Sequence, residues 1–232
     1  MTRVNEFGQP VGSALDWVPA PPVRPVELSG RYCSVEPWSH DHLDALYDAA
    51  VTRSPASSWT YLATPPLDTP TGLASWLDEL DAAPGSVPHV ICRPDGRAVG
   101  TASYLRLDAA NGSVEVGSIA YAAELQRTRA ATEAMYLMAR HVFDELGYRR
   151  YEWKCDSLNA PSRSAAQRLG FTYEGTFRNA VVYAGRTRDT AWFSITDEEW
   201  PALRAGFERW LSPDNFDADG VQRSRLRGAG PA

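Results

Sequence analysis

A strand, a basic turn and a long helix follow one another directly in the middle of the chain, and this succession constrains the fold most. The strand pattern covers residues 113–121, the turn covers 125–132 and the helical pattern covers 131–146. Such a turn directs backbone N–H groups and the positive end of the helix dipole at one point, which suits a phosphate or pyrophosphate. Arg127 and Arg129 add positive charge there. The alternative is an ordinary strand–turn–helix corner with solvated arginines.

Three predicted strands in a row, 89–93, 98–107 and the strand at 113–121, are joined by two hairpin signals. These signals are Pro94-Asp95-Gly96 and Asn111-Gly112, and they make the three strands antiparallel. The order β α α β β β α β α β β α predicts an α/β (α+β) single domain with a mixed, mostly antiparallel sheet. The other predicted elements are a strand at 31–36, helices at 39–51 and around 73–80, a strand at 150–155, a helix at 162–169, a hairpin of 171–182 with 187–195, and a helix at 198–211.

Composition divides the chain into three segments. Residues 1–28 hold five prolines, which exclude a helix and a central strand, so an extended arm attached through Phe7 and Trp17 is expected. The domain spans 29–211, and with 44% hydrophobic residues in the chain it can bury one substantial core. Residues 212–232 are polar, so a flexible C-terminal tail is expected.

Charge and cysteine content exclude several classes of function. The net charge of −6 leaves no globally basic surface for nucleic acid. Three cysteines without a CxxC pair support neither a disulfide framework nor a zinc site, so no metal is expected. The absence of an apolar run near 18 residues, and of a signal-peptide pattern, predicts a cytoplasmic protein without membrane contact.

Local motifs in the second half of the chain resemble the GNAT superfamily of acyl-CoA-dependent N-acyltransferases. The turn 126–131 is similar to the family's pyrophosphate loop. Asn159-Ala160-Pro161-Ser162, followed by Gly170-Phe171, resembles the helix of the ribosomal-protein alanine acetyltransferase branch. Glu174-Gly175 before a hairpin with Arg188-Asp189-Thr190 is the third match. The resemblance covers roughly residues 30–200 and implies a GNAT-like fold with acetyl-CoA, or another acyl-CoA, as the acyl donor.

The resemblance also implies roles for individual residues. A backbone N–H near Tyr121 would contact the developing oxyanion, and Ser162 would hydrogen-bond the departing thiolate. The alternative role of Ser162 and Asn159 is structural, in the cap and turn that begin the helix. The residues expected to bind the donor are Ile119, Tyr121, Gln126, Arg127, Thr128, Arg129, Ala130, Ala131, Thr132, Asn159 and Ser162.

Glu115 is the candidate for drawing a proton from the attacking ammonium, because it lies on a strand two residues before a glycine. Its alternative is a solvated or salt-bridged strand carboxylate. Trp59, Tyr61 and Ser118 are the candidate acceptor-binding residues. For the two aromatic residues, which stand in a predicted loop, packing into the core is the alternative.

The chain departs from the family pattern at several positions. Arg129 stands where the loop has its first glycine, and Ala166 stands where many members have a tyrosine. The expected reaction transfers an acyl group, in the first instance acetyl, to an amine of a small molecule or a peptide N-terminus. Two alternatives stay open: an enzyme that takes its acyl group from aminoacyl-tRNA, and a catalytically idle binding module. A homodimer through the closing strands or the arm is also expected.

Overall fold

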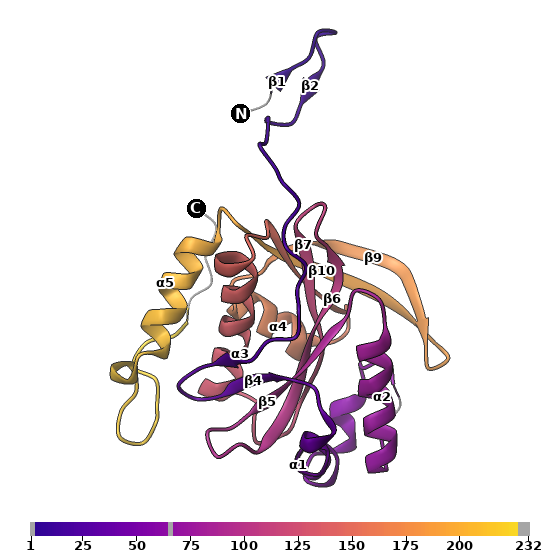
Figure 1. Ribbon diagram of the computed structural model, residues 1–232, viewed down its shortest axis with the longest axis vertical. Coiled ribbons are helices and arrows are strands. Elements are labelled where there is room, and N and C mark those ends of the chain that lie inside the picture. Colours follow the sequence, from indigo (N-terminus) through magenta and orange to yellow (C-terminus); the bar gives the residue numbers. More distant parts are fainter. Residues whose placement is uncertain (1–2, 65–66, 227–232) are drawn as a thin grey trace.

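The computed structural model describes residues 3–64 and 67–226 (Figure 1). Its main sheet has eight strands in the order β3-β4-β5-β6-β7-β8-β10-β9. Neighbouring strands are antiparallel, except that β7 and β8 run parallel. The bounds are Leu28–Ser29 (β3), Ser34–Pro37 (β4), Val87–Cys92 (β5), Ala98–Asp108 (β6), Ser113–Tyr121 (β7), Arg150–Asp156 (β8), Thr172–Tyr183 (β9) and Arg186–Thr196 (β10).

Helices cover both faces of this sheet. On one face α1 lies against β6 and α2 against β5, and on the other α3 lies against β3 and β4 and α4 against β8 and β9 (Figure 1). The helix α5 packs beside α3. The bounds are Leu43–Tyr47 (α1), Pro70–Ala82 (α2), Arg129–Arg140 (α3), Ala160–Arg168 (α4) and Trp200–Leu211 (α5), with short 3-10 or π turns at His40–His42, Asp48–Thr52, Ala56–Trp59, His141–Glu145 and Pro213–Asn215.

Local sequence explains where these helices begin and what they bury. Thr69 caps α2 by accepting a hydrogen bond from the backbone of Gly72 at 3.1 Å, and Pro70 occupies the first turn. Leu73 and Leu77, four residues apart, bury the same side of that helix. The central helix α3 is buried along most of its length, so it forms the middle of the core beneath the sheet.

The N-terminal arm leaves the domain as an extended segment and ends in a small hairpin of β1 (Arg3–Val4) and β2 (Pro10–Val11) (Figure 1). Trp17 attaches it, as expected: its indole N–H donates to the carbonyl of Ala110 at 2.6 Å. A Cβ at Gly112 would lie 2.4 Å from that ring, so glycine is required there. The expectation for Phe7 is wrong, because its side chain is 77% exposed.

The segment after α5 contacts the domain over residues 212–226. It contains the 3-10 turn Pro213–Asn215, and Phe216 is buried with its ring against Trp210. The amide of Asn215 donates to the carbonyl of Trp210 at 3.0 Å. Residues 227–232 of the expected tail, like residues 1–2 of the expected arm, lie outside the described residues.

The predicted fold class and element order are confirmed, including the three antiparallel strands and the closing hairpin. The first main strand begins at Ser34, later than the expected start at residue 31. The reason is the buried carboxylate of Glu133 on α3, which accepts hydrogen bonds from the backbone of Arg31, Tyr32 and Cys33. Those three amides are therefore directed at a side chain and not at a neighbouring strand.

Candidate active site

The parallel strands β7 and β8 are paired only over their first halves. Their register runs from Ser113 opposite Arg150 to Val116 opposite Trp153, and the strands continue without pairing beyond that point. On its other edge, β7 has a bulge against β6 at Ser118 and Ile119, and Ser118 has a φ of 48°. The strand register therefore assigns these two residues no partner on either β6 or β8, and the backbone of β7 is irregular where it leaves β8.

The chain that follows β7 leads into the N-terminus of α3. Thr128 caps this helix, because its hydroxyl accepts from the backbone of Ala131 at 3.1 Å. Arg127 turns the chain with a φ of 62°. Within the described residues, no backbone or side-chain acceptor serves the amides of Arg129 and Ala130. The predicted anion-binding corner thus has two open N–H groups at the positive end of a twelve-residue helix.

The two arginines of this turn have different surroundings. The side chain of Arg127 is exposed. The guanidinium of Arg129 lies 4.9 Å from the ring centre of Tyr32 and 4.5 Å from that of Phe216, so two aromatic rings hold it away from the turn. Arg168 of α4 adds a further cation, donating to the hydroxyl of Thr132 at 3.1 Å in the first turn of α3.

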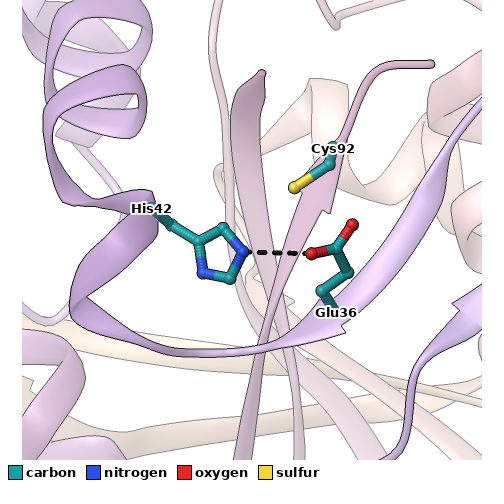
Figure 2. A group of neighbouring side chains, drawn as sticks. All are labelled: Glu36, His42 and Cys92. Carbon is teal, nitrogen blue, oxygen red and sulfur yellow. Dashed lines mark hydrogen bonds and ion pairs between the residues drawn. The ribbon is translucent and has the colours of Figure 1, made fainter. Parts of the chain in front are cut away.

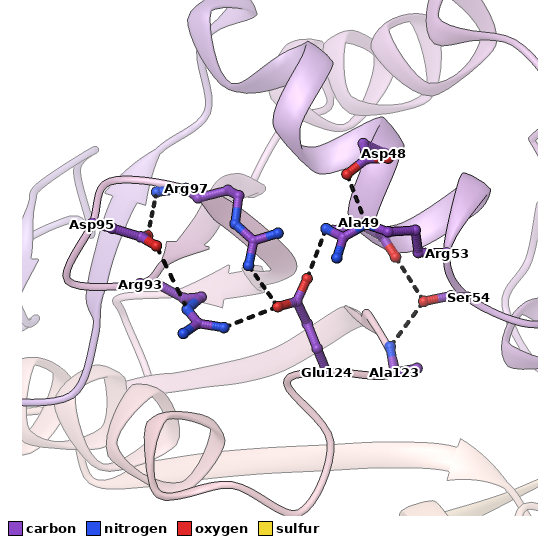
Figure 3. A network of polar contacts seen from close by, with 9 residues as sticks. All are labelled: Asp48, Ala49, Arg53, Ser54, Arg93, Asp95, Arg97, Ala123 and Glu124. Atoms are coloured by element: carbon purple, nitrogen blue, oxygen red, sulfur yellow. Dashed lines mark hydrogen bonds and ion pairs between the residues drawn. The ribbon is translucent and has the colours of Figure 1, made fainter.

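A polar network fixes the loop between β7 and α3 (Figure 3). Glu124 in that loop accepts hydrogen bonds from the guanidinium groups of Arg53 at 2.9 Å, Arg93 at 3.0 Å and Arg97 at 2.7 Å. Burial raises the pKa of Glu124, but the three arginines outweigh this and hold it below its ordinary value. The adjacent Ala123 donates its N–H to the hydroxyl of Ser54 at 2.8 Å. The loop that leads to the turn is therefore held from two sides.

On the other side of the parted strands, α4 begins at the predicted motif. Asn159 is its N-cap and accepts from the backbone of Ser162 at 3.1 Å. The hydroxyl of Ser162 accepts from the indole N–H of Trp153 at 3.0 Å. Burial raises the pKa of the Cys155 thiol, and a hydrogen bond from the same Ser162 hydroxyl opposes this effect. The N-cap is therefore Asn159, and the alternative expectation that Ser162 caps this helix is wrong.

Glu115 lies in a buried network of charges. Arg106 donates to its carboxylate, and the ammonium of Lys154 lies 3.0 Å from the same oxygen. That ammonium is also 2.7 Å from Glu152, which Arg150 contacts at 2.7 Å. Burial raises the pKa of Glu152, yet the bonds from Lys154 and Arg150 hold it below its ordinary value. Glu115 is therefore a salt-bridged strand carboxylate, and it faces the side of the sheet opposite α4.

The candidate acceptor residues separate into two groups. Trp59 is buried, and its ring packs edge-on against that of Trp76 with the ring centres 5.8 Å apart. It therefore packs into the core, as the alternative for this residue predicted. Tyr61 extends its hydroxyl to the carbonyl of Leu158 at 3.2 Å, in the loop between β8 and α4. Ser118 occupies the bulge, where its carbonyl accepts from the hydroxyl of Thr101 at 3.0 Å. Tyr61 thus lies beyond the end of β8 and Ser118 beyond the paired half of β7, while Trp59 belongs to a 3-10 turn that contacts β7.

Tyr121 and Gln126 contact each other across the turn. The side-chain amide of Gln126 donates to the carbonyl of Tyr121 at 3.1 Å. The hydroxyl of Tyr121 is buried without a hydrogen-bond partner among the described residues, and burial raises its pKa well above the ordinary value. In the register with β6, Tyr121 lies opposite Gly100, whereas Ser118 and Ile119 fall in the bulge.

A second group of polar side chains lies apart from this corner. Glu36, His42 and Cys92 bring a carboxylate, an imidazole and a thiol within 4.8 Å of one another (Figure 2). The Glu36 carboxylate accepts from the hydroxyl of Ser34 at 2.6 Å and contacts His42 at 3.1 Å. Burial, with the charge of Glu36, raises the pKa of the Cys92 thiol to about 12, so the thiol keeps its proton at neutral pH. The group joins β4, β5 and the start of α1.

Some residues of the site carried no signal in the sequence. Lys154 and Asp156 alternate along β8 with Trp153 and Cys155, and such alternation of polar and apolar residues occurs in any half-buried strand. Arg168 stands in the last turn of α4, 36 residues from the threonine that it contacts. Only the pairing of distant strands and helices brings these groups to one place.

This chain belongs to the acetyltransferase (GNAT) domain family, whose model matches residues 34–172. A GCN5-related N-acetyltransferase from Brucella melitensis has a crystal structure that superimposes with a TM-score of 0.88 at 41% identity, over 91% of this chain and 96% of that one. A probable GNAT-family acetyltransferase from Chromobacterium violaceum gives 0.77 at 36% identity, over 83% and 98%. The chain therefore has the fold and the family membership of the GNAT acetyltransferases.

Among curated proteins, the chain is 29% identical over 106 residues to the Bacillus subtilis protein named "Putative ribosomal N-acetyltransferase YdaF". It is 28% identical over 115 residues to the N-acetyltransferase p20 of Bacillus licheniformis. The matched segments cover 46% and 48% of this chain and 57% and 62% of those relatives. Within the described residues, no helix has both the length and the apolar character needed to cross a membrane.

Proposed function

We propose that the protein transfers an acetyl group from acetyl-CoA to the α-amino group at the N-terminus of a peptide or protein. One observation carries the proposal: β7 and β8 part after Val116 and Trp153, and the chain that leaves β7 runs through residues 122–128 into the open amides of α3. A thioester whose phosphates bind at the helix end can extend between the two unpaired strand ends. The GNAT family implies acetyl-CoA as this donor, which favours it over aminoacyl-tRNA.

The residues of this chain fit such a donor. The amides of Arg129 and Ala130, with the exposed Arg127, would hold phosphate oxygens. A backbone N–H in the β7 segment from the bulge at Ser118 and Ile119 to Tyr121 would hydrogen-bond the oxygen that gains charge when the acetyl group is attacked; one such donor contributes on the order of 3 kcal/mol in other acyl transfers. Acetyl-CoA, when bound, supplies the activated acetyl group.

Two side chains have proposed roles in proton movement. The hydroxyl of Ser162 would donate to the departing sulfur. Glu115 is proposed to receive, through water, the proton that the acceptor ammonium must lose before its nitrogen attacks; the same carboxylate contacts Lys154 and Arg106. The N-cap Asn159 fixes the position of Ser162.

The acceptor class rests on the curated relative whose name refers to ribosomal N-acetylation and on the sheet face described below. The test is incubation of purified protein with acetyl-CoA and pentapeptides that begin with alanine, serine or methionine. Mass spectrometry should show one acetyl group added at the peptide N-terminus. The same peptides with a blocked N-terminus should stay unmodified. Acetylation of simple alkylamines but of none of the peptides would contradict the proposed acceptor class.

A further inference from the structure

Asp156, the last residue of β8, has an unusual electrostatic environment. The residue is 5% exposed. Its carboxylate accepts from the hydroxyl of Tyr183 at 2.8 Å and from the backbone of Leu158 at 2.9 Å. Both donors are neutral, and among the described residues Asp156 takes part in no ion pair, unlike Glu115 and Glu152. A buried carboxylate is costly unless a cation pairs with it, and two of its acceptor positions are still open.

Strand register places two further side chains beside it. Thr190 of β10 lies directly opposite Asp156, and Phe177 of β9 lies directly opposite Thr190. Paired residues share a face of the sheet, so the three side chains form one row. We call them the Asp156 row. The row faces away from α4. Trp153 and Cys155 point to that helix, and Asp156, next to Cys155 on β8, points to the opposite face because side chains alternate along a strand.

The row contains a hydrogen-bonding group without a partner. Thr190 is 5% exposed, and its hydroxyl has no hydrogen bond within the described part of the chain. Two residues further along β10 and on the same face, the indole N–H of Trp192 is also buried and unpartnered. Buried donors are nearly always paired in folded proteins. Lys154 on the same face already pairs with Glu115 and Glu152. Two unpartnered donors near a carboxylate that forms no ion pair of its own within the described residues indicate a ligand that is positive at one end and carries acceptor oxygens.

The row lies at the unpaired end of β8. Asp156 is three residues beyond Trp153, the last residue of β8 that pairs with β7. Neighbouring loops meet there: Tyr61 contacts Leu158, and Arg186 at the turn between β9 and β10 donates to the carbonyl of Thr60 at 3.1 Å. Phe177 is 58% exposed and offers apolar surface at the outer edge of the row.

We infer that Asp156 binds the α-ammonium of the acceptor, and that the hydroxyl of Thr190 and the indole of Trp192 donate to carbonyl oxygens of its first residues. Phe177 contacts an apolar part of the same segment. The inference rests on the proposed function and narrows it to acceptors with a primary ammonium followed by peptide carbonyls. Tyr183 positions the carboxylate through its hydrogen bond.

The experiment compares wild-type protein with Asp156→Asn and Thr190→Val. Calorimetry in the presence of CoA measures binding of the three free pentapeptides and of their N-acetylated forms. Asp156→Asn should weaken binding of the free peptides at least about tenfold, as loss of a charge-assisted hydrogen bond does. The Kd for acetyl-CoA should change less than about twofold, and the acetylated peptides should bind both proteins equally weakly. Thr190→Val should weaken binding by a smaller factor and leave the fold intact.

The matched control is Asp197→Asn, which removes an exposed carboxylate just beyond the other end of β10 and should bind the peptides as wild type does. Unchanged peptide binding in both Asp156→Asn and Thr190→Val would overturn the inference. If the wild type acetylates peptides while the two variants keep its KM, the proposed function stands and the inference fails. If the wild type binds free peptides through Asp156 without acetylating them, the proposed function fails and the binding site stands.

Discussion

The ammonium of Lys154 lies 3.0 Å from the carboxylate of Glu115, and their side chains are only 6% and 5% exposed. Because Glu152 shares the same ammonium at 2.7 Å, one lysine serves two buried carboxylates. The indole of Trp192 covers it, with its ring centre 3.8 Å away. This lysine is therefore the central cation on the face of the sheet that we assign to the acceptor.

Lys154→Met should be strongly destabilising, because it leaves two buried carboxylates short of a cation. Breaking a buried pair in this way costs on the order of 3–5 kcal/mol. Urea denaturation measures the free energy of unfolding. Arg204→Met is the control, since Arg204 pairs with Asp144 and Glu208 at the surface, where ion pairs contribute roughly 0–1 kcal/mol. An equal decrease in the free energy of unfolding in the two variants would argue against a buried charge network around Lys154.

Glu115→Gln should lower kcat, and most at low pH, where more of the acceptor amine carries a proton that must be removed. The measurement is kcat against pH for both proteins, with a thermal melt to establish that the variant is folded. A variant whose profile keeps the wild-type shape would remove Glu115 from proton transfer and leave it a structural partner of Lys154.

Arg127→Ala and Arg129→Ala should have different effects. Arg127 is exposed beside the open amides of α3, so its loss should raise the Kd for acetyl-CoA and flatten the dependence of binding on salt. Arg129 is stacked between Tyr32 and Phe216, so its loss should lower the free energy of unfolding by about 1–2 kcal/mol. Calorimetry and urea denaturation together separate the effects. A larger change of Kd in Arg129→Ala would reverse the two assignments.

Ser162→Ala should slow acetyl transfer in a single turnover, since it removes the proposed proton donor to sulfur. It also leaves the indole N–H of Trp153 without its acceptor, which costs about 1–3 kcal/mol of stability. Ser164→Ala, an exposed change on the same helix, is the matched control. Transfer at the wild-type rate in Ser162→Ala would restrict Ser162 to a packing role.

Stability should fall in mild acid. The bonds from Arg150 lower the pKa of Glu174 below its ordinary value of 4.5, and those from Lys154 and Arg150 lower that of Glu152 against the effect of burial. A carboxyl group whose pKa is lower in the folded state stabilises the fold above its unfolded-state value and loses that contribution as pH falls through the folded-state pKa. Melting temperatures between about pH 3 and pH 7 should therefore drop below about pH 4.5. Glu174→Gln should make this drop shallower.

The strands and helices could be predicted because their signals are local. Turns such as Asn111-Gly112, the cap at Thr69 and the periodicity of α3 each lie within a few residues, and the structure has them where the sequence indicates. The turn before α3 was recognisable for the same reason. The resemblance then supplied the order in which the elements are assembled.

The surroundings of individual side chains could not be predicted, because they depend on residues far apart in the sequence. The sequence predicts that Arg129 binds phosphate. In the structure its guanidinium packs against the rings of Tyr32 and Phe216, which lie 97 positions before it and 87 positions after it. Glu133 looks like an ordinary helix carboxylate, although it binds three backbone amides of the segment before β4. Asp156 acquires its environment only when β9, β10 and β8 align.

The position of Phe216 against Arg129 has a practical consequence for handling the protein. A chain cut after Leu211 would lose one of the two rings that restrain this guanidinium, which frees its charge to reorient beside the open amides of Arg129 and Ala130. Preparations shortened at this point should therefore differ in their affinity for acetyl-CoA from those that keep Phe216. Affinity handles belong on the projecting N-terminal hairpin instead.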